Sequence, residues 1–457
     1  MTSPSTLANR LSRPFLRFFE IEASSAILLF AMTVAALAWS NSPVAETYER
    51  FWHSHLALAA GPWRLEMSLA HFVTDALMTI FFFVVGMEIK RELLHGELST
   101  RQKAMLPAAG ALGGMVVPAL LYTAFHYGGP ALRGWGIPMA TDIAFAVATM
   151  SLLGPRVPRG LKVFLLALAI ADDLGAVAVI AVFYTEHVSL PFLAAALLTL
   201  CLVYGLNRAG VQAFSVYWVV GGVAWLFTLQ SGVHATVAGV ALGFLTPSTV
   251  RDPGDESLLD RGRHLVERLR ELVHLGRDEH GSARHEAFRE LRRMGLDAMS
   301  PLDYLMNELT RWVAFVVMPI FALANAGVSL DAISLDDPQT GRVGLAVALG
   351  LLLGKPIGIT LFSFAAVKLG LAALPRGVGW GAVVATGLLA GIGFTVALFI
   401  TNLAFSAPEH VAGAKIGILS GSALATLLGL LALHRSLGRP PRTDLAFDPK
   451  MSDRSRE

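Results

Sequence analysis

Four ionisable side chains lie inside otherwise apolar stretches of the 457-residue chain: Asp142, Asp172, Asp173 and Lys355. A charged group at the centre of a membrane-spanning helix costs about 2.5–3.5 kcal/mol on insertion scales. Four uncompensated groups would cost about 10–14 kcal/mol, which rivals the stability of a typical domain, about 5–15 kcal/mol. We therefore expect these side chains to cluster in one polar cavity, where they are paired, neutralised or hydrated.

Three acids and one base could bind a cation and protons in turn. Carboxylate, hydroxyl and carbonyl oxygens suit hard cations, and no Cys or His cluster indicates zinc or copper. Asp172 and Asp173 are neighbours and would point about 100° apart on a helix, so one could pair with Lys355 while the other faces water. A buried ion pair that only fixes helix packing is the alternative for that pairing. Competition between protons and Na⁺ or Li⁺ at one site would produce ion/proton exchange.

The overall composition places these residues in a membrane protein. The chain is 54% hydrophobic and 15% charged, with a mean hydropathy of +0.59, whereas globular domains average about 25% charged residues. These values exclude disorder, and the single cysteine excludes a disulfide scaffold. A net charge of +2 argues against a nucleic-acid surface.

Twelve apolar runs have about the length of a bilayer-spanning helix, roughly 20 residues. They are apolar on every face and do not alternate, so they predict helices rather than a barrel. We therefore predict an all-α polytopic membrane protein with about 12 transmembrane helices. The runs are 21–40, 69–89, 104–126, 132–153, 161–184, 191–207, 213–229, 233–247, 311–330, 343–369, 380–405 and 411–434.

Lys and Arg divide unevenly between the short loops on the two sides, fifteen against five. Cytoplasmic loops are the richer ones, which predicts a cytoplasmic segment at 1–20, spans 1–8 at 21–247, spans 9–12 at 301–435 and a cytoplasmic tail at 436–457. The five basic residues expected outside are Arg50, Arg64, Arg133, Arg342 and Lys415.

The segment 248–300 differs from the rest, with ten Arg, eleven Asp or Glu and four His. Apolar residues recur within it at near-helical spacing. We interpret it as a charged cytoplasmic loop with one or two amphipathic helices. It is either simply solvated or a regulatory or partner-binding segment.

Backbone-breaking residues interrupt two of the predicted spans. Pro138 precedes Asp142 in span four, and Gly391 and Gly393 precede Thr395 in span eleven. Interruptions at matching places in two halves of a transporter indicate a binding site. The two spans are the middle members of spans 3–5 and 10–12, which suggests inverted repeats with two broken helices.

Eight motifs together resemble the NhaA-type sodium/proton antiporter family, in the family's order and over about 20–435 apart from the charged loop. Inverted repeats are a known property of that family. The motifs are 20–23 (EIEA), 86–93 (GMEIKREL), 140–145 (ATDIAF), 171–175 (ADDLG), 231–236 (SGVHAT), 321–328 (FALANAGV), 354–356 (GKP) and 391–395 (GIGFT).

The resemblance implies roles for the central residues. Asp172 and Asp173 would bind Na⁺ and protons and would be the metal ligands, with Asp172 able to pair with Lys355. Thr141 would place a hydroxyl near the ion. Lys355 and Asp142 would compensate the charges at the exposed ends of the broken helices. Asp142 would alternatively be an ion ligand.

The resemblance also implies roles at the margins of the site. Gly391, Gly393 and Thr395 would form the broken-helix backbone. Glu88 and Glu92 would belong to a cytoplasmic funnel and its pH response, or would be ordinary interfacial charges. His234 is expected to be a packing histidine.

The function implied is a secondary antiporter, not an enzyme, that exchanges cytoplasmic Na⁺ or Li⁺ for external protons in a bacterial inner membrane. The exchange would be electrogenic and would serve pH and sodium homeostasis. No cofactor is expected. The partners would be the transported ions and the lipid bilayer, with no nucleic acid, and a homodimer is left open.

One segment departs from the family pattern. Span nine usually begins with a Glu-His pair, a second His and a Pro before Trp-Val, whereas residues 305–313 here read LMNELTRWV. For this segment the resemblance therefore does not imply the family's pH activation, whereas it still implies the transport core.

Three other functions are alternatives to an antiporter. An intramembrane aspartyl protease would place its two acids on different helices, one in a Gly-x-Gly-Asp context that does not occur here. A channel would show repeated filter loops or charged rings. A transporter of another cation, or a member that has lost transport, stays open.

Overall fold

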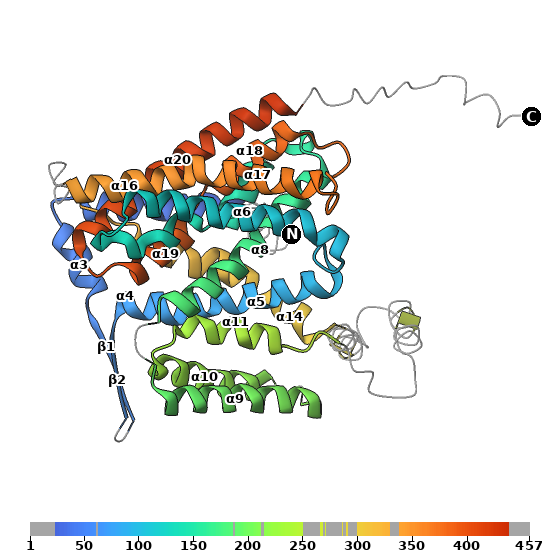
Figure 1. Cartoon of the computed structure of the whole chain (residues 1–457). Helices are drawn as coiled ribbons and strands as arrows, with labels where there is room; N and C mark the ends of the chain where they lie inside the picture. Colours follow the sequence, from blue (N-terminus) through green and yellow to red (C-terminus); the bar gives the residue numbers. More distant parts are fainter. Residues whose placement is uncertain are drawn as a thin grey trace, which may run out of the picture.

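The computed structural model describes residues 23–60, 63–185, 188–211, 214–249, 299–329 and 338–437, with six further residues between 266 and 290. The described residues form a helical bundle with one β-hairpin (Figure 1). The helices before the charged loop are α2 (Ala23–Ser40), α3 (Ala45–Trp52), α4 (Leu69–Phe72), α5 (Met78–His95), α6 (Arg101–Phe125), α7 (Ile143–Ser151), α8 (Arg159–Phe183), α9 (Leu190–Ala209), α10 (Phe214–Ser231) and α11 (Ala235–Leu245).

The second part of the chain is also helical. Its helices are α14 (Pro301–Trp312), α15 (Met318–Asn325), α16 (Pro338–Leu349), α17 (Lys355–Lys368), α18 (Trp380–Ala390), α19 (Phe394–Ala404) and α20 (Pro408–Ser436). Two short 3-10 segments are η2 (Pro130–Met139) and η3 (Gly154–Arg156). Three π-helical turns are η1 (Val73–Leu77), η4 (Val313–Val317) and η5 (Gly350–Gly354).

Seven helices of the described ranges are long and apolar enough to cross a bilayer. Two bent pairs, α2 with α3 (114°) and α18 with α19 (49°), raise this number to nine if each pair is one span. The three other predicted runs correspond to α10, α11 and the η2–α7 segment. The prediction of an all-α polytopic membrane protein is therefore confirmed.

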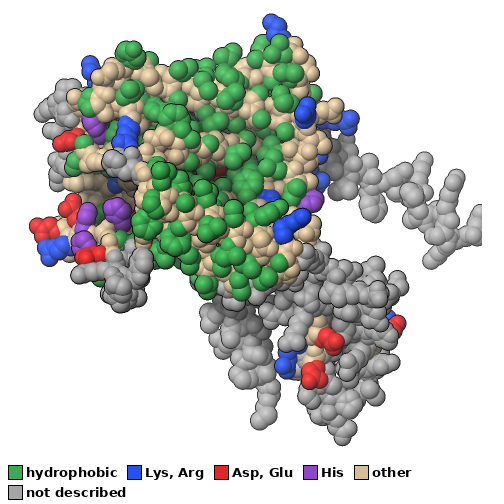
Figure 2. All heavy atoms as spheres, turned by 60° about the horizontal axis from the view of Figure 1, so that its bottom comes forward, with side chains coloured by type: hydrophobic (Ala, Val, Ile, Leu, Met, Phe, Trp, Pro, Cys, Tyr) green, Lys and Arg blue, Asp and Glu red, His purple; other side chains and the backbone are tan. Residues whose placement is uncertain are grey.

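The surface of the bundle is apolar where a bilayer would contact it. Figure 2 shows hydrophobic side chains across the middle of one face, with Lys, Arg, Asp, Glu and His mostly at its two ends. Leu198 on α9 is 73% exposed and Val182 on α8 is 69% exposed. Such exposure would be unfavourable in water and is suited to lipid.

The described helices pack as two groups. The first, the site group, contains α6, η2, α7, α8 and α16–α20, in which α6 packs mainly on α17, and α16 and α18 pack on α20. The second, the flanking group, contains α2–α5, α9–α11, α14 and α15, in which α5 packs on α11 and α15 on α2. Gly113 and Gly358 let α6 and α17 approach closely, because a Cβ on either glycine would collide with the other's carbonyl group.

Strands β1 (His55–Ala60) and β2 (Trp63–Ser68) form an antiparallel hairpin, with Leu56 opposite Met67. The apolar runs of the sequence did not predict this hairpin. The hairpin defines one end of the molecule, called the hairpin end below, at which α2, α6, α15 and α19 finish and α20 begins. The opposite end, where α11 finishes and α14 begins, is called the loop end.

Several predicted loop positions lie within regular elements instead. Lys415 lies in α20 and is half-buried, Arg342 lies in α16, and Arg64 lies in β2. The assignment of Lys415 to an outer loop was wrong, because this residue falls inside the apolar run 411–434 and within α20, which begins at Pro408. The segments 1–20 and 438–457 and nearly all of 248–300 lie outside the described residues.

Candidate functional site

A buried ion pair joins α17 and α8. Lys355 Nζ lies 2.5 Å from Asp172 Oδ2, and the two side chains are 0% and 2% exposed. Lys355 also donates to Thr141 Oγ1 at 2.8 Å, and Thr141 donates to the Ala390 carbonyl at 2.8 Å. The partner of Lys355 is therefore Asp172, the aspartate that the family resemblance indicated.

A change in helical winding precedes Lys355. The π-helical turn Gly350–Gly354 leads directly into α17, which begins at Lys355. A π turn adds a residue to the helix and shifts the direction in which the following side chains point. Lys355 thereby lies fully buried on the side of α17 that meets α8 and the segment before α7.

Asp173 contributes the second acid of the pair. It is 2% exposed, and its Oδ2, like Asp172 Oδ1, is buried without a hydrogen-bond partner among the described residues. Asp173 is close enough to Asp172, Glu88 and Asp142 to experience their charges. A buried carboxylate oxygen without a partner is unfavourable, so this place favours a bound proton or cation.

Asp142 lies where the two broken segments meet. Its Oδ1 accepts the Phe145 backbone N–H at 3.0 Å. Its Oδ2 accepts the Thr395 N–H at 3.3 Å and the Thr395 hydroxyl at 2.5 Å. The carboxylate thus caps α7 and α19 at once, at helix N-termini where negative charge is favourable. This geometry favours charge compensation over direct ion binding.

The break between α18 and α19 depends on close backbone approach. The Asp142 N–H donates to the Ile392 carbonyl at 2.6 Å. A Cβ on Gly391 would collide with the Leu351 carbonyl oxygen, and a Cβ on Gly393 would lie 3.3 Å from the Ala140 oxygen. The predicted broken-helix positions therefore lie at the crossing itself.

Sequence analysis missed two contacts at this break. Phe394 has a positive φ of 20° and donates its N–H to Ser422 Oγ on α20 at 3.3 Å. Thr395 was predicted as backbone only, yet its hydroxyl holds Asp142. Small hydroxyl residues in apolar helices are common, so the sequence carried no signal for either contact.

The two predicted funnel glutamates differ from each other. Glu88 on α5 is half-buried and near enough to Asp173 for their charges to interact. Glu92 Oε2 accepts the Glu97 backbone N–H at 2.8 Å, so it closes the turn that follows α5. His234 contacts Phe399 edge to face, with ring centroids 6.4 Å apart, as expected for a packing residue.

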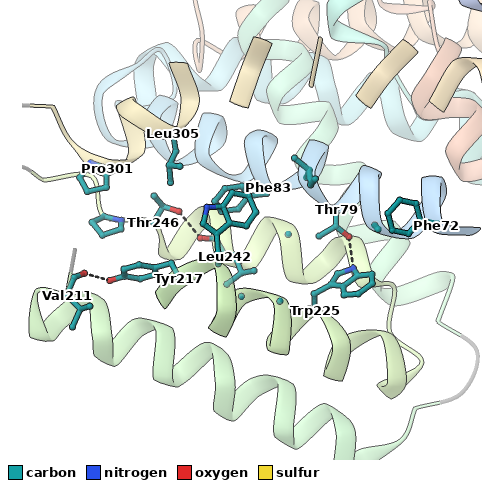
Figure 3. A pocket seen from close by; sticks show the side chains of 17 residues that line it. Phe72, Thr79, Phe83, Val211, Tyr217, Trp225, Leu242, Thr246, Pro301 and Leu305 are labelled. Carbon is teal, nitrogen blue, oxygen red and sulfur yellow. Dashed lines mark hydrogen bonds between the residues drawn. The ribbon is translucent and has the colours of Figure 1, made fainter. Parts of the chain in front are cut away.

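A separate cavity of about 280 Å³ lies between α5, α10 and α11 (Figure 3). Phe83, Leu242 and Trp225 line it, and Trp225 Nε1 donates to Thr79 Oγ1 at 3.1 Å. None of its described lining residues is acidic. It is therefore unsuited to a cation, and the polar cluster around Asp172 is the candidate site. The described residues also contain no group of three or more His, Cys, Asp or Glu arranged to hold a resident metal.

The chain is similar in sequence to known sodium/proton antiporters. The family model described as "Na+/H+ antiporter 1" matches residues 16–433. The Na(+)/H(+) antiporter NhaA of Rhodopirellula baltica is 45% identical over 441 residues, which cover 95% of this chain and 96% of that protein. The Na(+)/H(+) antiporter NhaA 2 of Sorangium cellulosum is 46% identical, covering 95% and 92% respectively.

A solved structure is similar in fold. The sodium proton antiporter MjNhaP1 from Methanocaldococcus jannaschii, determined at pH 8, aligns with a TM-score of 0.50 and 14% identity. The alignment covers 91% of this chain and 93% of that one.

Proposed function

The chain belongs to the Na⁺/H⁺ antiporter 1 family, and on this premise we propose that it exchanges cytoplasmic Na⁺ or Li⁺ for external protons at one site built on Asp172 and Asp173. Its relatives are transporters rather than enzymes. No cofactor enters the proposal.

The unsatisfied oxygens of the two aspartates carry this proposal. Asp172 Oδ1 and Asp173 Oδ2 are buried in the middle of α8, and no described residue forms a hydrogen bond with either oxygen. Each would gain from a proton or from a small hard cation. Thr141 shares the Lys355 ammonium with Asp172, so its hydroxyl oxygen would lie near a cation bound there.

The charge balance of the site makes protons and Na⁺ compete. One ammonium on Lys355 neutralises one carboxylate, so the cluster of Lys355, Asp172 and Asp173 carries one excess negative charge when both acids are ionised. A proton or a Na⁺ would neutralise that excess charge, whereas both together would leave the cluster with one excess positive charge. Na⁺ binding would therefore release a proton.

A second proton would come from the Asp172–Lys355 pair if Na⁺ displaced the ammonium. Exchange of two protons for one Na⁺ would move one net charge in each cycle. The membrane potential would then contribute about 2.3 kcal/mol per charge for each 100 mV. This is the basis on which we propose electrogenic exchange in the service of pH and sodium homeostasis.

The surrounding residues would support the exchange. Asp142 and Lys355 would balance the partial charges of the broken helix ends. Glu88 would attract cations toward Asp173 from the loop end. The interaction between the charges of these two acids would make transport sensitive to pH. Glu92 is the weaker funnel candidate, because its carboxylate caps the Glu97 N–H.

The distribution of basic residues sets the proposed orientation. Lys and Arg are concentrated in the loops of the loop end, which would face the cytoplasm together with both termini. The hairpin end would face outward. We propose that the protein lies in this orientation in a bacterial cytoplasmic membrane.

The function is tested in everted membrane vesicles that are acidified by respiration. Added NaCl or LiCl should dissipate the pH gradient of wild-type vesicles, followed by dye fluorescence, and should leave it intact with Asp173→Asn. Glu46→Gln is the matched control, since Glu46 is an exposed acid that pairs with Arg50 at the hairpin end. A response of Asp173→Asn equal to that of the control would contradict the proposed site.

A further inference from the structure

The hairpin end of α15 is firmly held by its own helix group. The Tyr48 hydroxyl on α3 donates to the carbonyls of Leu323 and Ala324, each at 2.9 Å. Asn41, the residue after α2, donates from its Nδ2 to the Val328 carbonyl at 2.8 Å. Carbonyls that have no partner within the helix are thereby capped by side chains of the flanking group. The end of α15 is therefore a fixed point against which other helices can be held.

Two further hydrogen bonds reach this point from the site group. Asn402 Nδ2 on α19 donates to Asn325 Oδ1 at 2.6 Å, and Lys415 Nζ on α20 donates to the Gly327 carbonyl at 3.1 Å. Asn325 is buried, and its own Nδ2 donates to the Phe321 carbonyl at 3.0 Å. That second bond leaves the Asn325 oxygen turned toward Asn402.

The same two helices also carry contacts at the broken segments. Thr395, which holds Asp142, precedes Asn402 by seven residues on α19. Lys415 precedes Ser422, which accepts the Phe394 N–H, by seven residues on α20. Seven residues of α-helix span about 10 Å. Each cross-group bond therefore lies two turns from a residue that fixes the break, on a continuous rigid helix.

Lys415 is an unusual residue for such a place. It is a half-buried cation in a predicted membrane span, and a neutral carbonyl is its hydrogen-bond partner among the described residues. Charges retained inside a membrane are costly and tend to be functional. Its position just beyond the C-terminus of α15 is favourable, because the helix dipole presents negative charge there.

We propose that Asn402 and Lys415 form a latch with Asn325 and Gly327 that closes the hairpin end of the seam between the two helix groups and opens when the site turns toward that end. The inference rests on the proposed function, because an exchanger must expose one site to each side in turn. Bonds across the seam must then break on the side that opens. The pair of neutral amides and the ammonium–carbonyl bond are breakable at modest cost, unlike the Asp172–Lys355 ion pair.

A cross-linking experiment tests the latch. Asn325→Cys and Asn402→Cys are combined in a Cys201→Ser background, since Cys201 is the chain's own cysteine. A short bifunctional thiosulfonate then joins the two groups in proteoliposomes. Cross-linking should lower Na⁺/H⁺ exchange at least tenfold, and reductant should restore it. Unchanged exchange in the cross-linked carrier would overturn the latch.

A matched control joins residues of the same helix group. Asn41→Cys with Val328→Cys bridges two positions of the flanking group that are already in contact. Cross-linking this pair should leave exchange within about twofold of the uncross-linked protein. Each single cysteine variant treated with the reagent controls for simple blocking of one side chain.

A second measurement does not depend on transport. Asn402→Ala removes one bond of the latch, and interhelical bonds of this kind contribute amounts that correspond to a shift of about 3- to 20-fold in an equilibrium. Hydrogen exchange of the amides of 396–404 should accelerate by that factor in detergent, with Asn402→Gln intermediate. Unaltered exchange rates in Asn402→Ala would refute the latch, whereas lack of transport by the unmodified protein would refute the proposed function instead.

Discussion

Lys355 Nζ lies 2.5 Å from Asp172 Oδ2, whereas the buried Oδ2 of the neighbouring Asp173 has no hydrogen-bond partner in the part of the chain that the structure describes. Two adjacent acids of the same helix are thus in different electrostatic states. Asp172 is balanced by an ammonium. On the proposed function, Asp173 would carry the excess charge that a proton or a cation neutralises. Substitutions at the two positions should therefore have different effects.

Asp173→Asn should weaken Na⁺ binding by about 10- to 100-fold, since a bond to a charged group contributes roughly 1.5–3 kcal/mol. The amide keeps the size of the side chain and removes its charge. Titration calorimetry of the purified protein in buffers of differing ionisation enthalpy measures both the affinity and the protons released. Wild-type protein that binds Na⁺ without releasing protons would remove the basis of the exchange mechanism.

Lys355→Met should destabilise the protein by about 3–5 kcal/mol, because it leaves the buried Asp172 carboxylate uncompensated. Adding Asp172→Asn to this variant should restore much of the loss. Thermal unfolding in detergent of the wild type, the two single variants and the double variant gives the coupling energy between the two positions. Strictly additive effects would mean that the pair does not act as an ion pair.

Thr395→Val should remove the hydroxyl bond to Asp142 and lower stability by about 1.5–3 kcal/mol. Thr395→Ser retains the hydroxyl and should stay close to wild type. Thermal unfolding and exchange measured side by side distinguish the two variants. Equal behaviour of valine and serine would show that the backbone N–H alone holds Asp142.

Gly391→Ala should destabilise the break by about 1–3 kcal/mol, because its Cβ would meet the Leu351 carbonyl oxygen. Gly205→Ala on α9 is the matched control, since no atom lies within 4 Å of its Cβ position. Alanine is favoured over glycine inside helices, so the control should be neutral or slightly stabilising. Equal unfolding temperatures of the two variants would contradict the close approach of Gly391 to the Leu351 carbonyl.

His126, just after α6 at the hairpin end, should contribute a pH dependence to stability. Burial lowers the pKa of this imidazole below its ordinary value of 6.5, and the charges of His410 and Arg342 add to the effect, while a backbone bond to Tyr122 opposes it. The unfolded chain therefore binds a proton at a higher pH than the folded protein does. Stability should be complete above about pH 6.5 and should fall as the pH drops through that value toward the folded pKa.

His126→Phe keeps an aromatic ring stacked near Tyr122, whose ring centroid lies 4.6 Å from that of His126. The variant should lose this part of the acid sensitivity and unfold at a temperature that varies less between pH 7 and pH 5. Identical pH profiles of the two proteins would exclude the contribution of His126.

The sequence predicted the membrane class and the four central charges because buried charges are costly and few reasons exist to retain them. Helical periodicity alone left open which aspartate meets Lys355, because the rotation of α8 about its axis is set by its packing against α5, α6 and α7. The family resemblance indicated Asp172. The hairpin was missed because its first strand, His55–Ala60, reads HLALAA and is too short and too rich in alanine to carry a clear strand pattern. Asn325, Asn402 and Ser422 were missed because uncharged polar residues in apolar helices have no distinctive spacing.

The single carboxylate of Asp142 holds the first turns of both α7 and α19. If α7 and α19 moved apart, Asp142 would lose its hydrogen bonds to one of the two helices. We therefore expect a displacement of the crossing to carry both interrupted segments along together.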